Sequence, residues 1–438
     1  MDRPRSECDV LIVGAGPAGL AAAYRAAQAG RDVTVVDDNA DAGGQIWRGA
    51  GTGREKPSPE AQVWFERVRS VAIDFISGAR VFQQIGPHML LAETPDGVRE
   101  LVYNDLVLAS GARERFLPFP GWTLPNVMGA GGLQALVKSG LPVSGKRVVV
   151  AGTGPLLPAV AGYLRGHGAA VLLIAEQAPL LRVARFGLSV VMHSGKKTQF
   201  FALRRELKAV RYLTDCWVVA AEGKDKLERV TLKRERERGK GSAKVWTESC
   251  DYLACGFHLV PNLELAELLG CEIAASVSVD EFQQTSVPHV YAVGEATGIG
   301  GLELSLVEGE IAGLAAAGKR EDARRLFPVR AKQLRFAGLL DRTFALRRQL
   351  KSLAGPETIV CRCEDVVFGR LRAHDSWRAA KLQTRCGMGP CQGRICGSAV
   401  EFLFGWKAES VRPPILPVRV ESLVSHKAQK EDTKSHKR

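Results

Sequence analysis

The sequence lacks the long apolar runs that would carry it through a membrane. No stretch reaches the roughly 18 apolar residues that a membrane-spanning helix needs. The most apolar region, 156–175, is interrupted by Arg165 and His167. The first ten residues, MDRPRSECDV, hold no apolar segment of the signal-peptide kind. These absences predict a cytoplasmic protein without a transmembrane segment, and they leave peripheral contact with a membrane surface open.

The sequence also lacks a concentrated run of basic residues, although its formal net charge is +13, from 60 Lys and Arg against 47 Asp and Glu. The basic residues are mixed with acids, as in LKRERERGKGSAK (232–244), which is typical of a solvated hairpin loop. This distribution argues against a nucleic-acid-binding protein. We expect the excess charge to serve anionic cofactors or an acidic partner protein.

A complete dinucleotide-binding fingerprint begins at residue 9. The apolar stretch DVLIV predicts a buried strand, and the turn Gly14-Ala15-Gly16-Pro17-Ala18-Gly19 leads into the helix-forming stretch LAAAYRAAQAG. In such a turn, Gly14 permits the tight bend, Gly16 admits a pyrophosphate and Gly19 lets helix and strand pack closely. The helix N-terminus offers amides and a positive dipole end to the phosphates. A second strand ends at Asp37, whose carboxylate is placed to bind ribose hydroxyls.

A strand near residue 290 indicates that this dinucleotide is FAD. The stretch HVYAVGE (289–295) ends in Gly294 and Glu295 and is followed by an apolar, glycine-rich helical stretch, LSLVEGEIAGLAAAG. In flavoproteins with two dinucleotide-binding domains, a similar strand returns to the FAD domain, and a Gly-Asp pair after it binds the ribityl chain. Here the acid is Glu295. The return therefore predicts one FAD domain with another domain inserted into it.

The inserted segment carries a second, damaged copy of the fingerprint. Residues 146–176 repeat the strand, turn, helix and strand, and DYLACG (251–256) echoes DLVLASG (105–111). Leu157 stands where the third glycine belongs, and Glu176 falls one residue after the position of Asp37. A slip of one residue on a strand points a side chain to the opposite face. Binding of NAD(P) or another nucleotide here is therefore doubtful, and a remodelled or purely structural domain is the preferred interpretation.

The chain also lacks the pair of closely spaced cysteines that disulfide reductases of this architecture place beside the flavin. Five of its ten cysteines are scattered through apolar stretches, where we expect them to act as small core residues. They are Cys8, Cys216, Cys250, Cys255 and Cys271. Thiol–disulfide chemistry at the flavin is therefore not expected.

The other five cysteines lie between residues 361 and 396, interleaved with glycines that free the backbone to wrap around a metal centre. Four thiolates suit a 2Fe-2S cluster or a zinc ion. Structural zinc usually takes CxxC pairs, whereas this segment has a CxC pair and a CxxxxC pair, which favours iron–sulfur. We select Cys361, Cys363, Cys391 and Cys396 as ligands, with Cys386 as a bystander or substitute.

Six stretches together resemble the larger, FAD-containing subunit of bacterial heteromeric amino-acid dehydrogenases, a family that includes opine oxidases, D-hydroxyproline dehydrogenase and hydrogen cyanide synthase. They are GGQIWR (43–48), LASGARERFLPFPGWTLPNVMGAGGLQALVKSG (108–140), GTGPLLPAVA (152–161), GFHLVPNLELAELLGCE (256–272), CRCEDV (361–366) and TRCGMGPCQGRICG (384–397). The last two resemble a ferredoxin-like domain of the bacterioferritin-associated type, in which the cysteines matching the four selected here hold a 2Fe-2S cluster.

The resemblance implies a division of labour between subunits. A separately encoded FAD subunit would oxidise an amino or imino acid, and electrons would pass into this chain and on to an acceptor. A small ferredoxin-like subunit is a further candidate partner. No catalytic residues are identified, and His258 and His289 are expected to be structural. The expected cofactor-binding residues are Gly14, Gly16, Pro17, Ala18, Gly19, Asp37, Gly44, Gln45, Arg48, Gly111, Arg113, Gly294 and Glu295.

The expected fold class is α/β, with tandem Rossmann-like domains, one inserted in the other, and a small C-terminal cluster domain. The FAD domain would comprise 1–118 and 278–318, and the inserted domain 119–277. A helical linker (319–356), a cluster domain (357–410) and an extended segment with a disordered tail (411–438) would follow. Two other functions stay open: an NAD(P)H-dependent flavin and iron–sulfur reductase, and a zinc-bearing interaction protein on a degenerate flavin fold.

Overall fold

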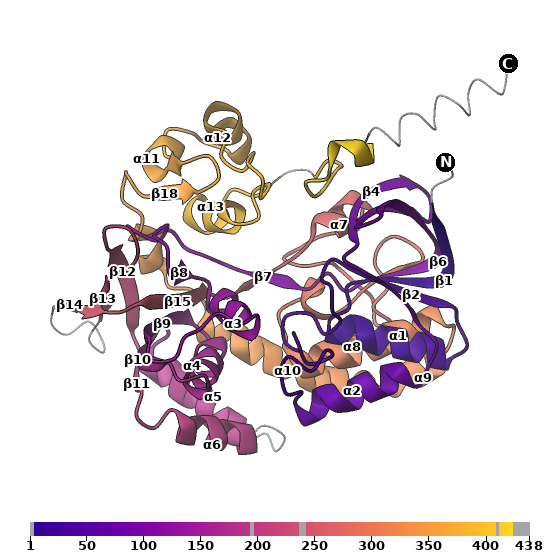
Figure 1. The fold of residues 1–438 in the computed structure, drawn as a ribbon, viewed down its shortest axis with the longest axis horizontal. Helices are drawn as coiled ribbons and strands as arrows, with labels where there is room; N and C mark the ends of the chain where they lie inside the picture. The colour runs from indigo at the N-terminus through magenta and orange to yellow at the C-terminus, as the bar shows by residue number, and fades with distance from the viewer. Residues whose placement is uncertain (1–3, 193–196, 236–241, 409–410, 424–438) are drawn as a thin grey trace. The chain divides into compact units, whose positions relative to one another are not determined.

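The computed structural model describes residues 4–192, 197–235, 242–408 and 411–423. These residues form two compact units (Figure 1). Unit 1 contains the chain up to Ala112, residues 261–335 and the last described segment, and unit 2 contains 113–260 and the chain from 336 to 408. The expected disordered tail begins within 411–438, and its part beyond residue 423 lies outside the described residues. Among the described residues, no helix is both long enough and apolar enough to cross a membrane.

Unit 1 is built on a mixed sheet in the order β3-β2-β1-β6-β5-β4, with β17 paired to β6. Strands β1, β2, β3, β6 and β17 run parallel, and β4 and β5 are antiparallel additions. The strands are β1 (Arg5–Val13), β2 (Val33–Asp37), β3 (Asp74–Ser77), β4 (Arg80–Gly86), β5 (Met89–Thr94), β6 (Gly97–Leu108) and β17 (Val290–Ala292). The helices are α1 (Pro17–Gln28), α2 (Pro59–Arg69), α7 (Glu264–Leu268), α8 (Leu302–Ala316) and α9 (Arg320–Arg324).

Small residues let α1 and α8 pack side by side in unit 1 (Figure 1). A Cβ atom at Gly309 would lie 2.2 Å from the carbonyl oxygen of Ala18, and one at Gly313 would lie 2.3 Å from that of Ala22. Any side chain at these two positions would push the helices apart. The glycine-rich helix noticed in the sequence is therefore explained by helix–helix contact, and it holds the C-terminal part of unit 1 against the first nucleotide-binding helix.

Unit 2 repeats the plan with a parallel sheet in the order β11-β10-β9-β15-β8. In unit 1, β1 lies between β2 and β6, and in unit 2, β9 lies between β10 and β15. The predicted duplication is therefore present. The strands are β8 (Val127–Met128), β9 (Arg147–Thr153), β10 (Ala170–Glu176), β11 (Arg211–Leu213) and β15 (Tyr252–Phe257); the helices are α3 (Ala130–Lys138), α4 (Leu156–Gly166), α5 (Leu180–Met192) and α6 (Lys197–Glu206).

The two faces of the unit 2 sheet pack against different layers. Val148 and Val150 face α3 and α4, whereas Val149 and Ala151 face a three-stranded antiparallel sheet. That sheet comprises β12 (Cys216–Glu222), β13 (Arg229–Arg234) and β14 (Lys244–Ser249). Strands β13 and β14 pair as the predicted hairpin requires, and the centre of its loop, 236–241, lies outside the described residues.

The cysteine-rich segment forms a small module within unit 2. It contains β18 (Ile359–Cys361), β19 (Val366–Val367), α11 (Phe368–Leu371), α12 (Trp377–Thr384) and α13 (Cys396–Phe404), gathered around an apolar core (Figure 1). The indole Nε1 of Trp122 donates to the carbonyl of Ile359 at 2.5 Å, which ties the module to the nucleotide fold of the same unit.

Four segments connect or complete these units. The chain crosses between them in β7 (Ala112–Glu114), β16 (Leu259–Pro261) and α10 (Phe327–Phe344), and α10 is followed by a short 3-10 helix, η3 (Arg348–Ser352). The last described segment, 411–423, packs on unit 1: the amide of Ile415 donates to Phe82 at 2.9 Å, and Arg419 forms an ion pair with Glu93.

Candidate cofactor sites

The first glycine-rich turn has the geometry that its sequence predicts. Gly14 adopts φ +111°, and a Cβ atom there would lie 2.2 Å from the carbonyl oxygen of Ala109. A Cβ atom at Gly19 would lie 1.8 Å from the carbonyl oxygen of Gly14. Helix α1 begins at Pro17, and no side chain caps its N-terminus. The turn therefore brings a bare helix end close to the carboxyl end of β1.

Asp37 and the loop containing GGQIWR lie against this turn. One carboxylate oxygen of Asp37 accepts from the amide of Ala15 at 2.5 Å, and the other accepts from the amide of Asn39 at 2.8 Å. The amide of Gly43 donates to the carbonyl of Ala15 at 2.8 Å, and a Cβ atom at Gly44 would lie 3.0 Å from the Cα of Gly16. The structure therefore gathers the predicted residues 14–19, Asp37 and Gly44.

Arg48 joins the same group through Asn39. Its Nη2 donates to the side-chain oxygen of Asn39 at 2.9 Å, while its Nε is buried without a partner among the described residues. A buried, unsatisfied guanidinium nitrogen is costly, so it indicates a missing acceptor. Gln45 is exposed. The glycine cradle, the half-buried Asp37 and the unsatisfied Arg48 together fit an anionic dinucleotide.

The turn after β17 completes the unit 1 site. A Cβ atom at Gly294 would lie 2.9 Å from that of Ala18, so this turn touches the start of α1. Glu295 accepts from the amide of Gly301 at 3.1 Å. Glu308, which is 3% exposed, accepts from the amide of Gly294 at 2.9 Å and from the hydroxyl of Thr297 at 2.8 Å. Glu308 was missed from the sequence, although an acid inside an apolar helix was the available signal.

Gly111 and Arg113 fall in different units. In unit 1, Gly111 accepts from the amide of Asn262 at 3.0 Å. Arg113 belongs to unit 2, where its Nε donates to the carbonyl of Arg394 at 3.1 Å. The predicted role of Arg113 in flavin binding therefore stays a prediction, and its described partner lies in the cysteine-rich module.

Three cysteine sulfurs converge inside that module. The Sγ atoms of Cys361, Cys386 and Cys396 lie within 4.8 Å of one another, and those of Cys386 and Cys396 are 4.0 Å apart. All three residues are buried. Hydrogen bonds from Cys386 and Cys396 lower the pKa of the Cys361 thiol, so the group favours a thiolate. A buried group of three converging sulfurs fits a thiophilic metal centre.

The other two cysteines of the segment lie nearer to solvent. Cys363 is exposed and hydrogen-bonds to Cys391, which is half-buried. A Cβ atom at Gly389 would lie 2.4 Å from that of Cys363, so this glycine lets the loop approach the CxC pair. Cys386, expected to be a bystander or substitute, therefore lies with Cys361 and Cys396, while Cys363 and Cys391 form a pair of their own.

The five scattered cysteines are all buried and unpaired with one another, as predicted. Burial raises the pKa of Cys8 to about 11 and the pKa values of Cys216 and Cys250 to about 12. Such thiols are poor nucleophiles. They are core residues, which confirms the sequence interpretation.

His258 and His289 each lie near a carboxylate. His258 Nε2 lies 3.9 Å from Asp341, and burial lowers the pKa of its imidazole. His289, on the surface, lies 3.1 Å from Asp105 through Nδ1. These contacts support the structural interpretation of both residues.

The second fingerprint differs from its prediction at Glu176. The second fingerprint has one residue more between its first glycine and its acid than the first fingerprint has. An irregularity in the register between Val171 and Leu173 accommodates that residue, so that Gly152 pairs with Glu176. The carboxylate then accepts from the amide of Gly154 at 2.7 Å. The expectation that Glu176 points away from the turn was wrong, because strand irregularities cannot be counted from spacing alone.

Comparisons with known proteins agree with the two nucleotide folds. The sequence model of the pyridine nucleotide-disulphide oxidoreductase family matches residues 8–311, which ends before the cysteine-rich module. Hydrogen cyanide synthase subunit HcnB of Pseudomonas protegens is 33% identical over 429 residues, covering 88% of this chain and 89% of the relative. One subunit of the opine oxidase of Rhizobium meliloti is 31% identical over 470 residues, covering 95% of this chain and 87% of the relative.

Two solved structures share the fold. L-proline dehydrogenase from P. horikoshii superposes with a TM-score of 0.66 at 19% identity, covering 97% of this chain and 80% of that one. Thioredoxin reductase from T. acidophilum superposes with a TM-score of 0.54 at 22% identity, covering 71% and 98%. At these identities the likeness concerns the fold alone.

Proposed function

Because this chain belongs to the pyridine nucleotide-disulphide oxidoreductase family of oxidoreductases, we propose that it is the electron-transfer subunit of a heteromeric amino-acid or imino-acid dehydrogenase. In this proposal it binds FAD and a 2Fe-2S cluster and relays electrons from a partner flavoprotein subunit to an acceptor. The substrate of the complex would be of the opine, D-hydroxyproline or glycine type. The observation that carries the proposal is the convergence of Cys361, Cys386 and Cys396 in a chain that also has a complete dinucleotide turn.

The residues of unit 1 have defined tasks in binding FAD. The amides at the start of α1 bind the pyrophosphate, with the backbone of Gly16 close to it. Asp37 accepts from the ribose hydroxyls, and Arg48 supplies a cation whose unsatisfied Nε can donate to the anionic dinucleotide. Glu308 fixes the turn at Gly294, which we assign to the ribityl chain.

The cysteine-rich module holds the second cofactor. Cys361, Cys363, Cys391 and Cys396 are the proposed ligands, and Cys386 is a buried thiol next to two of them. When bound, the flavin accepts electrons as a pair and the cluster carries them one at a time, so the two cofactors together convert between these modes. The protein contributes the low-polarity surroundings and the hydrogen bonds that tune both potentials.

Substrate oxidation is assigned to a second subunit because the described residues hold no catalytic constellation beyond the two carboxylate-bound histidines. The names of the relatives support this assignment, since both HcnB and the opine oxidase relative are subunits of their enzymes. A separately encoded FAD subunit, with or without a small ferredoxin-like subunit, is the proposed partner.

Two measurements on the anaerobically purified full chain test the proposal. We expect FAD together with iron and acid-labile sulfide, and no oxidation of an opine, D-hydroxyproline or glycine with an artificial acceptor. Co-expression with the flavoprotein encoded by a neighbouring gene should restore turnover. Zinc without sulfide would contradict the cluster, and turnover by the chain alone would contradict the division of labour.

A further inference from the structure

The carboxylate that should bind a second ribose is buried inside unit 2. Oε2 of Glu176 accepts from the amide of Gly154 at 2.7 Å. Oε1 accepts from the hydroxyl of Thr153 at 2.8 Å and from the amide of Ala178 at 2.7 Å. The residue is 0% exposed, whereas Asp37 in the first fold is half-buried. Glu176 therefore sits at the expected register but has no surface to offer a ligand.

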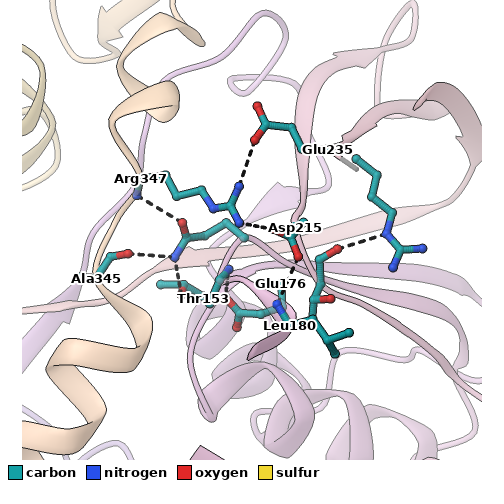
Figure 2. Close-up of polar contacts among 11 residues, drawn as sticks. Thr153, Glu176, Leu180, Asp215, Glu235, Ala345 and Arg347 are labelled. Carbon is teal, nitrogen blue, oxygen red and sulfur yellow. Dashed lines mark hydrogen bonds and ion pairs between the residues drawn. The ribbon is translucent and has the colours of Figure 1, made fainter. Parts of the chain in front are cut away.

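The chain that follows α10 covers this position (Figure 2). The side-chain amide of Gln177 donates to Thr153 Oγ1 at 2.9 Å and to the carbonyl of Ala345 at 3.3 Å. Its oxygen accepts from the amide of Arg347 at 3.2 Å. Thr153 also donates to the carbonyl of Phe344 at 3.3 Å. Residues at the ends of β9 and β10 are thus bonded to the backbone of 344–347.

Arg347 fastens the segment from its other side. Its guanidinium pairs with Asp215 and, at 3.0 Å, with Glu235 (Figure 2). The guanidinium also lies over the ring of Trp217. Its side chain is only 13% exposed, so these ion pairs are largely shielded from solvent. Breaking a shielded ion pair costs much more free energy than breaking an exposed one. The segment is therefore held at both ends of its backbone and by a side chain.

The turn itself is also remodelled. Gly154 adopts φ +97°, whereas its counterpart Gly16 adopts φ −72°. Leu157, which replaces the third glycine, is fully buried. Helix α4 begins at Leu156, one residue later in the motif than α1. The amides of the second turn therefore do not present the phosphate-binding arrangement of the first.

In dinucleotide folds the adenosine ribose lies over the acid that ends the second strand, beside the glycine-rich turn. We propose that the segment Phe344–Arg347 stands in that position and closes the second nucleotide fold, so that this chain takes no electrons from NADH or NADPH. The closure does not depend on the cluster or on the partner protein. The tests of the cluster and of the partner protein therefore have no bearing on whether the second fold is closed.

The first test uses the full chain with FAD bound, so that the first fold is occupied. ADP, NADH and NADPH are added, and binding is measured by equilibrium dialysis while flavin absorbance is followed without oxygen. We expect no saturable binding of any of the three and no rapid bleaching of the flavin. One equivalent of bound ADP per chain, or fast bleaching by either reduced nucleotide, would overturn the proposal.

The second test loosens the segment. Gln177→Ala removes the bonds to Ala345 and Arg347, and Asp215→Asn weakens the hold on the guanidinium. Either change should increase the rate of trypsin cleavage after Arg347 or Arg348 about tenfold, which corresponds to one lost interaction of ordinary strength. Glu222→Gln is the matched control, because it removes an exposed ion pair with Arg229 elsewhere in unit 2. Equal cleavage of all four proteins would overturn the proposed closure.

Hydrogen exchange of the unaltered chain needs no variant, so it tests the closure even if a variant does not fold. The amide of Arg347 donates to a fully buried side chain, so it should exchange much more slowly than the amides of an exposed stretch such as 224–226. Exchange of the Arg347 amide as fast as in that stretch would show that the segment is open, and would contradict the proposal.

Discussion

The Nε of Arg113 donates to the backbone carbonyl oxygen of Arg394 at 3.1 Å. Arg394 lies between Cys391 and Cys396, and Arg113 follows the Gly111 turn by two residues. One hydrogen bond thus joins the loop that carries two proposed ligands to the segment that follows unit 1. This contact makes Arg113 a positioning residue for the cysteine loop.

Arg113→Ala should loosen that loop and speed the loss of the cluster. Removing the donor leaves a partly buried carbonyl unsatisfied, at a cost of about 1 kcal/mol. The measurement is the rate at which a chelator bleaches the visible absorbance of the reconstituted full chain, and the variant should bleach faster. Lys407→Ala, which removes an exposed ion pair with Glu401, should bleach like the unaltered protein. Equal rates for all three would refute the positioning role.

Serine substitutions distinguish the proposed ligands from their neighbour. Cys361→Ser, Cys363→Ser, Cys391→Ser and Cys396→Ser should each lose iron and acid-labile sulfide. Cys386→Ser should keep both and shift the midpoint potential, because a hydroxyl would replace a thiol 4.0 Å from the Cys396 sulfur. Iron analysis and a redox titration followed by electron paramagnetic resonance provide the readouts.

The opposite result would change which cysteines are assigned as ligands of the cluster. If Cys386→Ser lost the cluster while Cys363→Ser kept it, the buried group of Cys361, Cys386 and Cys396 would supply three of the four ligands. The structure already shows why sequence spacing cannot decide this point. Cys386 follows α12 and Cys396 begins α13, and the packing of both segments into one apolar core brings the sulfurs together.

The geometry of the first glycine-rich turn was predictable because most of its determinants are local. The turn, α1 and the strand ending at Asp37 lie within a short stretch, and Gly19 is required by its close contact with the nearby Gly14. Glu176 shows the limit of the same argument. Its position depends on a register irregularity in β10 that changes the face of every later side chain, and no residue type at Val171 or Leu173 announces it.

Contacts over long sequence separation were also beyond prediction. The sequence predicted residues 319–356 only as a helical linker. Its residues 344–347 bond to Thr153 and Gln177, at sequence separations of 191 and 168 residues. Polar backbone atoms of a linker carry no pattern that would reveal such partners.

Two glycine substitutions in the first turn should have different effects. Gly19→Ala forces a Cβ atom to 1.8 Å from the carbonyl of Gly14, so it should destabilise unit 1 itself by about 1–3 kcal/mol. Gly16→Ala meets nothing closer than 4.0 Å, so the chain should fold normally but bind FAD weakly. Thermal unfolding of the apo chain and FAD titration separate the two effects. If Gly16→Ala bound FAD with normal affinity, the assignment of the pyrophosphate to this turn would be wrong.

Glu308 should make stability depend on pH. Burial raises the pKa of its carboxyl to about 7 in the folded chain, against an ordinary value of 4.5. Between these values the folded state binds more protons than the unfolded state, so stability falls as pH rises from about 4.5 to 7 and then levels off. Glu176, whose pKa burial also raises to about 7, contributes in the same direction.

Glu308→Gln removes the ionisable group and keeps an oxygen that can accept from Gly294 and Thr297. The variant should therefore equal the unaltered chain near pH 5 and exceed its stability at pH 8 by about 1–3 kcal/mol, since one pKa unit corresponds to about 1.4 kcal/mol. Denaturant unfolding at both pH values measures this difference. The pH dependence of unfolding that remains in Glu308→Gln is attributed to Glu176. Adding Glu176→Gln should reduce that dependence further. If Glu308→Gln were equally destabilised at both pH values, the carboxylate would be the form that holds the Gly294 turn, and the assigned protonation would be wrong.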